Sequence, residues 1–146
     1  MKMSTKGRYA LRVMMELASH HGRGPLLVGT IAKNQGISAN YIHVLVTGLR
    51  SAGLVRSVRG PSGGYELARR PGAITALDVI TAVEGPGVVV ECVTDASACP
   101  RANGCVAREV WCEVAAAVDG VLAGLTLEQL ASRQRSKQEE PASYEI

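Results

Sequence analysis

Residues 36–67 read GISANYIHVLVTGLRSAGLVRSVRGPSGGYEL, and most of the information about the fold lies in this stretch. Gly36 ends a short helix predicted over residues 28–35, and Ser38 offers an N-cap oxygen to a second helix that runs to about residue 52. Two helices joined by a tight glycine-containing turn form a helix-turn-helix. Two strand-like runs, 54–58 and 65–67, then flank a glycine-rich loop, so the order of elements predicts a winged helix.

Helical signals extend on both sides of this unit. Apolar residues recur at helical spacing over residues 5–20, and Thr75 and Asp78 form a capping-box pattern that opens a helix to about residue 84. A long helix is expected over residues 106–123, and Thr126 caps a short final helix. We therefore predict a mainly α protein with one small β-hairpin. Its parts are a winged helix-turn-helix (1–84), a cysteine-containing loop (85–105), a dimerisation helix with a short final helix (106–133) and a disordered polar tail (134–146).

The predicted long helix carries an apolar stripe. Its members are Trp111, Val114, Ala115, Val118, Val121, Leu122 and Leu125. A small domain has few faces on which to bury so long a stripe, which favours a partner helix from a second subunit. Packing of the stripe within the monomer is the alternative.

Charge is divided unevenly along the chain. Residues 1–70 contain eleven Lys or Arg and two acidic residues, whereas residues 71–146 contain five and eleven. A basic half attracts phosphate, and an acidic half does not lie along it, so the chain is expected to bind nucleic acid through its first half.

No apolar run approaches the ~20 residues that cross a bilayer, and the N-terminus lacks a secretory pattern. We expect a cytoplasmic protein without a membrane partner, whose thiols stay reduced.

The helix-turn-helix predicts which side chains meet DNA, because the start of the second helix faces base edges in the major groove. The predicted base readers are Ser38, Asn40, Tyr41, His43 and Val44. Phosphate contacts, which set register and make affinity depend on salt, are expected from Lys6, Arg8, Arg50 and Arg56. In the predicted wing, Arg59 suits the negative potential of a minor groove, beside Gly60, Pro61 and Ser62.

An enzymatic interpretation of the wing loop fails. Residues 60–64 match the G-x-S-x-G pattern of serine hydrolases, which need an acid and then a histidine after the serine. All three histidines precede Ser62, and the chain is too short for that fold. We therefore predict no enzyme activity.

Four cysteines, at positions 92, 99, 105 and 112, lie in one window of 21 residues, and the other 125 positions have none. Zinc ribbons usually use C-x2-C pairs, so these wider spacings speak against structural zinc. Thiolates gathered in one segment suit an iron–sulfur cluster, with Cys92, Cys99 and Cys105 as ligands. Cys112 is a weaker candidate, because seven helical residues place it ~10 Å from Cys105 along the axis.

Several motifs together resemble the IscR/NsrR/CymR-type winged-helix transcription regulators, over roughly residues 1–134. They are Ser4–Ala10, Gly36–Tyr41, Val58–Tyr65 and Thr126–Leu127. The cysteines place the resemblance in the iron–sulfur-binding branch, nearest to IscR. The resemblance implies a homodimeric regulator of a roughly palindromic DNA operator, which senses iron–sulfur status, redox state or nitric oxide. It implies a cluster, [2Fe–2S] in preference to [4Fe–4S], on the three cysteines.

The chain departs from this family at three positions. Arg108 stands where IscR proteins have a histidine ligand, Arg8 is the nearest match to the aspartate ligand of NsrR proteins, and His43 stands where IscR has glutamate. A guanidinium is not a practical iron ligand, so the fourth ligand stays open among Cys112, Glu109, Glu113 and a small exogenous molecule. The alternatives are a thiol-switch or zinc-stabilised regulator without iron, and a module that docks on a metabolic enzyme, as CymR-like relatives do.

Overall fold

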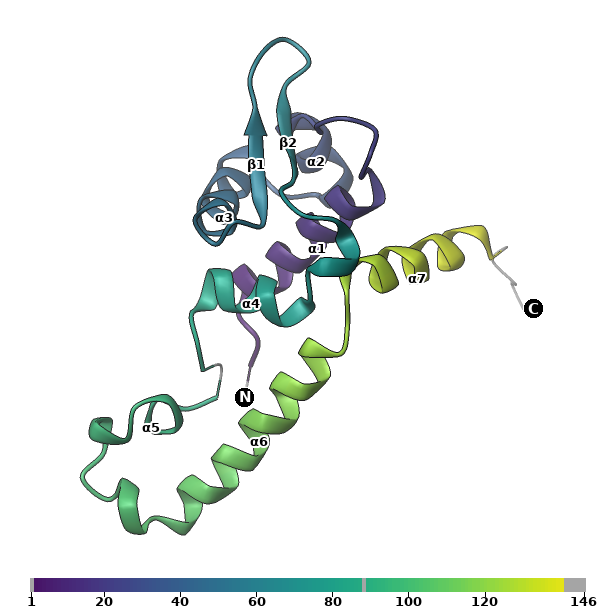
Figure 1. Ribbon diagram of the computed structural model, residues 1–146. Coiled ribbons are helices and arrows are strands. Elements are labelled where there is room, and N and C mark those ends of the chain that lie inside the picture. The colour runs from purple at the N-terminus through teal and green to yellow at the C-terminus, as the bar shows by residue number, and fades with distance from the viewer. Residues whose placement is uncertain (1, 88, 141–146) are drawn as a thin grey trace.

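The computed structural model describes residues 2–87 and 89–140. Its elements are α1 Thr5–Ser19, α2 Val28–Gln35, α3 Ala39–Ser51, β1 Val55–Val58, β2 Gly64–Leu67, α4 Ala76–Glu84, α5 Glu91–Thr94, α6 Val106–Ala123 and α7 Leu127–Glu139, with 3-10 turns at Pro71–Ala73, Ala96–Ala98 and Ala102–Gly104. The mainly α architecture with one antiparallel hairpin confirms the predicted winged helix. The hairpin projects from the helical body as a wing (Figure 1).

Helix α1 runs through the middle of the core. Its apolar side chains recur at helical spacing, and Ala10, Val13 and Met14 are fully buried. Helix α3 turns Leu45 and Leu49 inward, as its period predicts, and both are fully buried. These side chains share one cluster with residues of α4 and α7, so the core holds α3 rigidly while its other face stays free.

The wing is attached to the chain that enters α2. Val55 pairs with Leu67 in the antiparallel register, and Tyr65 forms an isolated bridge with Leu26. The Tyr65 amide donates to the Leu26 carbonyl and the Leu26 amide donates to the Tyr65 carbonyl, each at 2.9 Å. The close approach needs glycine at 64, because a Cβ there would lie 2.0 Å from the Leu26 oxygen.

Two capping boxes meet where α4 and α7 begin. Thr75 caps α4 together with Asp78, as the sequence predicts, and Thr126 caps α7 together with Gln129. Thr75 and Thr126 also form a β-bridge, flanked by a 2.8 Å hydrogen bond from the Ala76 amide to the Leu125 carbonyl. The start of α7 is thereby tied to the start of α4.

Two segments differ from the sequence-based expectations. Residues 85–105 were expected to form a loop, but they contain α5 and two 3-10 turns. Helix α7 continues to Glu139, so residues 134–139 are helical rather than part of a disordered tail. Gln, Arg, Lys and Glu are good helix formers, and a capped helix continues through them without an apolar face. Residues 141–146 of the expected tail lie outside the described residues.

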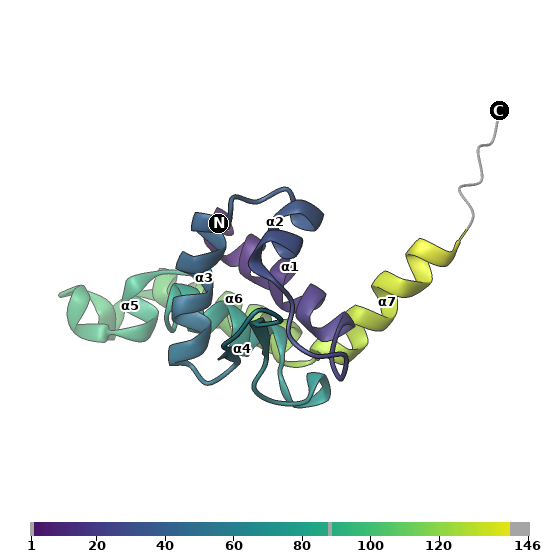
Figure 2. The ribbon, with the colours of Figure 1, turned by 90° about the horizontal axis from the view of Figure 1, so that it is seen from above.

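The elements spread out around the body. In both views α5 lies on one side and α7 extends on the other (Figures 1 and 2), and Figure 1 shows α5 beside the N-terminal part of α6. The wing and α5 lie at opposite ends of the molecule in Figure 1. No helix within residues 2–87 and 89–140 is long and apolar enough to cross a membrane.

Candidate nucleic-acid interface and cysteine segment

One face of α3 is exposed along its length. Asn40, His43 and Val44, three of the predicted base readers, lie on it, and Thr47 continues it by one turn. Val44 is 55% exposed, which is unusual for a valine on a helix that packs against a core. The face offers an amide, an imidazole and an aliphatic group, which are groups that read base edges in a major groove. The Thr47 hydroxyl donates back to the His43 carbonyl at 2.9 Å, so it is engaged within the helix.

Two predicted base readers have structural roles. The Ser38 hydroxyl caps α3 by accepting a hydrogen bond from the Tyr41 amide at 3.2 Å. The Tyr41 ring is half-buried and packs edge-on against Tyr9, with the ring centroids 6.0 Å apart. The guanidinium of Arg8 lies 5.9 Å from the Tyr9 centroid, so α1 brings a cation close to the start of α3.

The predicted phosphate contacts divide into free and engaged side chains. Lys6, Arg8 and Arg50 are exposed, as is Arg59, which was predicted for the minor groove. Arg56 is also exposed, but its Nε donates to the Glu66 carboxylate across the hairpin at 2.8 Å. An exposed ion pair contributes under ~1 kcal/mol, so it stabilises the wing weakly and part of the Arg56 charge is already neutralised.

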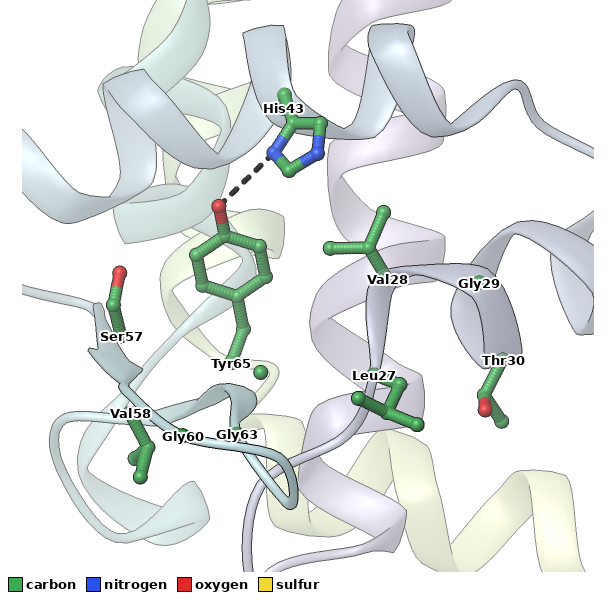
Figure 3. Close-up of a pocket in the computed structure, with 11 residues that line it drawn as sticks. Leu27, Val28, Gly29, Thr30, His43, Ser57, Val58, Gly60, Gly63 and Tyr65 are labelled. Atoms are coloured by element: carbon green, nitrogen blue, oxygen red, sulfur yellow. Dashed lines mark hydrogen bonds between the residues drawn. The ribbon is translucent and has the colours of Figure 1, made fainter.

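A hollow of about 700 Å³ separates the wing from the helix-turn-helix. Leu27, Val28 and Gly29 line it on one side and wing residues on the other, as Figure 3 shows. His43 and Tyr65 meet across it, where the Tyr65 hydroxyl lies 3.0 Å from Nδ1 of His43 (Figure 3). The predicted wing residues Gly60, Pro61 and Ser62 are exposed at the tip of the wing, between β1 and β2.

The cysteine segment, defined as residues 89–105, lies beside the start of α6. Cys92, Cys99, Cys105 and Cys112 are free thiols of intermediate exposure. Arg108 of α6 donates from Nε to the Cys92 carbonyl at 2.7 Å, which ties α5 to α6. Asp95 accepts from the side chain of Ser97 at 2.6 Å and from its amide at 2.9 Å, and these bonds lower the pKa of Asp95 below 3.8.

The predicted metal ligands do not converge in this arrangement. Among the described residues, no three His, Cys, Asp or Glu side chains lie close enough together to hold one metal ion. Glu109 and Glu113, the other candidates for a fourth ligand, are exposed on α6, and Arg108 is engaged with the backbone. The donor set as placed therefore does not form a site for a single metal ion.

Helix α6 has no buried residue among its eighteen positions. Val106 is 71% exposed and Val121 is 64% exposed, at opposite ends of the helix. Within the predicted stripe, Trp111 is also exposed, whereas Val114 and Val118 are half-buried. Packing inside the monomer therefore covers the helix only in part.

The comparisons with known proteins agree with this architecture. The model of the Rrf2 family, described as "Iron-dependent Transcriptional regulator", matches residues 3–133. The chain belongs to the Rrf2 family. HTH-type transcriptional regulator CymR of Bacillus subtilis is 46% identical over 139 residues, covering 95% of this chain and 96% of CymR.

Solved structures of Rrf2-type relatives share the fold. "The Structure of CymR (YrzC) the Global Cysteine Regulator of B. subtilis" matches with a TM-score of 0.75 and 47% identity, covering 91% of this chain and 98% of that one. "T. potens IscR" matches with a TM-score of 0.78 and 35% identity, covering 99% and 95%. The expected family is confirmed, and the chain is a transcription regulator rather than an enzyme.

Proposed function

We propose that this Rrf2-family protein is a cytoplasmic homodimer that binds a roughly palindromic DNA operator and changes its affinity with the chemical state of the thiols in the cysteine segment. The observation that carries DNA binding is the exposed face of α3, where Asn40, His43 and Val44 lie free of the core. The wing adds Arg59 beside this face, and the basic charge of residues 1–70 supplies attraction to phosphate. Two such helices spaced about 34 Å apart would meet successive major grooves.

The DNA-binding part of the proposal is tested by selecting duplexes from a randomised library. Asn40→Ala should weaken binding to the selected duplex by about 1–3 kcal/mol while leaving binding to unrelated DNA nearly unchanged. Asn34→Ala is the matched control, because Asn34 donates to Glu16 from α2 rather than lying on the exposed face of α3. Equal losses for selected and unrelated DNA would contradict the assignment of α3 as the recognition helix.

The exposed apolar positions of α6 support a second copy of the chain as its partner. Val106, Val110 and Val121 are at least half exposed, and burying such side chains is worth about 1.5–3 kcal/mol each. Val110→Lys should therefore shift the dimer towards monomer in sedimentation, whereas Lys137→Val at the polar end of α7 should not. A Val110→Lys variant that stays dimeric at micromolar concentration would refute α6 as the dimer contact.

Two chemical states of the cysteine segment are candidates for the signal. The resemblance to IscR and the iron-dependent description of the family support an iron–sulfur cluster, [2Fe–2S] in preference to [4Fe–4S], on Cys92, Cys99 and Cys105. The second candidate is a thiol switch or zinc-stabilised regulator without iron. The separate placement of the free thiols and the likeness to the cysteine regulator CymR favour this second candidate.

Anaerobic purification separates the two candidates. A brown protein with bound iron and sulfide supports the cluster, and a colourless protein supports zinc or free thiols. Cys99→Ala should then remove the difference in operator affinity between the two states, and Cys112→Ala should preserve it if only three cysteines act. Operator affinity that is the same in both states of the unchanged protein would end the sensing proposal.

A further inference from the structure

The recognition helix and the wing meet at one polar contact whose consequence for base selection can be derived. The Tyr65 hydroxyl lies 3.0 Å from Nδ1 of His43, and the two rings stand edge to face with centroids 6.0 Å apart. His43 belongs to the exposed face of α3, and Tyr65 belongs to β2. A base-reading candidate is therefore held by a residue that is half-buried in the wing (Figure 3).

The position of Tyr65 is defined from both sides of its strand. It stands opposite Ser57 in the hairpin register, and its backbone exchanges two 2.9 Å hydrogen bonds with Leu26 at the entry to α2. Gly64 before it admits no side chain without a clash against the Leu26 backbone. The hydroxyl is thus presented to His43 from a braced backbone rather than from a loose loop.

The contact determines which nitrogen of His43 carries a proton. In neutral imidazole one ring nitrogen donates and the other accepts, and the partner of one nitrogen fixes the role of the other. A phenol gives up its proton more readily than neutral imidazole does, so the Tyr65 hydroxyl donates and Nδ1 accepts. Nε2, on the far side of the ring from Tyr65, then carries the N–H.

We propose that Tyr65 is a positioning residue that makes His43 a hydrogen-bond donor towards DNA and thereby selects guanine at one position of each half-site. Guanine shows two adjacent acceptors, N7 and O6, in the major groove, whereas adenine shows a donor beside its N7 and thymine shows a single acceptor, O4, beside its methyl group. The inference rests on the proposed DNA binding, and it adds a wing residue to the determinants of sequence choice. Tyr65 acts through His43 and needs no contact with a base.

The first test needs no DNA. Nitrogen-15 NMR of the histidine side chains should show His43 wholly as the Nε2–H tautomer in the unchanged protein and with a measurable share of the Nδ1–H tautomer in Tyr65→Phe. His43→Ala identifies the signal among the three histidines. A purely structural role of Tyr65 would leave the tautomer unchanged, and that result would overturn the inference.

The second test uses the duplexes selected by the unchanged protein from a randomised library. The guanine to be replaced is the one at which His43→Ala loses its preference. Its replacement should lower the affinity of the unchanged protein for the duplex at least ~5-fold, and the affinity of Tyr65→Phe by less than ~2-fold. Tyr65→Phe added to His43→Ala should change that ratio no further. Tyr9→Phe is the matched control, because Tyr9 packs against Tyr41 in the core-facing layer, and it should keep the guanine preference.

The outcomes separate this inference from the proposed function. If the unchanged protein selects a duplex and Tyr65→Phe keeps the same guanine preference, the inference is wrong and the proposed function stands. A uniform loss of affinity over all duplexes in Tyr65→Phe, with an unchanged ratio, also overturns it. If the unchanged protein selects no duplex, the proposed function fails and the inference fails with it.

Discussion

Replacing Gly64 by alanine should destabilise the protein by an amount that follows from the junction between the wing and the entry to α2. An added Cβ would lie 2.0 Å from the Leu26 carbonyl oxygen, 2.5 Å from its carbon and 2.9 Å from the Leu27 nitrogen, all of which are backbone atoms. Backbone cannot rotate away as a flexible side chain does, so β2 and the segment that enters α2 must move apart by about 1 Å, given that packed carbon and oxygen atoms need over 3 Å.

Such a separation breaks both hydrogen bonds between Leu26 and Tyr65, which are 2.9 Å long. Each contributes a net ~1 kcal/mol, and the backbone conformation of Gly64, with φ of 153°, costs an alanine about 1 kcal/mol more. The free energy of unfolding should fall by about 3 kcal/mol. For a chain of 146 residues this lowers Tm by roughly 6–12 °C.

The assay is thermal unfolding followed by circular dichroism at one fixed protein concentration, because a dimer's Tm depends on concentration. Gly29→Ala is the matched control, since a Cβ at this exposed position of α2 meets nothing within 4 Å. It should leave Tm unchanged or raise it, because alanine favours the helix by up to ~1 kcal/mol. A Gly64→Ala protein that melts within 2 °C (about 0.7 kcal/mol) of the unchanged protein would refute the reasoning.

Three further outcomes are expected. Thr75→Ala removes the hydroxyl that caps α4 and should lower the free energy of unfolding by about 1 kcal/mol in urea titration, whereas Thr75→Ser should retain most of it. Because the pKa of Asp95 lies below 3.8, its bonds to Ser97 are complete at neutral pH and are lost as pH falls through the lowered pKa. Protection of the Ser97 amide from hydrogen exchange should disappear there, and a protection factor that stays the same after Asp95 is protonated would contradict this. Arg59→Ala should reduce the slope of log affinity against log salt by about 1, and an unchanged slope would contradict the placement of the Arg59 charge in the minor groove.

The cysteine segment shows why the candidate site could be predicted only in part. The spacing of the four cysteines indicates thiol or metal chemistry, because soft ligands must be gathered to act together. Their actual separation depends on how α5 and its flanking turns fold and on the bond from Arg108 to Cys92. In the sequence, Arg108 is notable only because it stands where IscR proteins have a histidine ligand. In the structure, it joins α6 to α5 through its hydrogen bond to the Cys92 carbonyl.

The elements themselves follow from interactions between near neighbours in the chain. Ser38 and the capping box at Thr75 act across three residues, and the apolar period of α1 and α3 needs only the geometry of one helix, so the sequence was sufficient for the winged helix and its exposed α3 face. Contacts between distant residues were decided by tertiary packing alone. His43 contacts Tyr65, which is 22 residues further along the chain. Tyr65 pairs with Leu26 where Gly64 packs against the Leu26 backbone, and no local pattern predicts that pairing. Such contacts form only when the whole core places two strands and a helix together, because their cost in chain entropy is repaid by that packing and by no local preference.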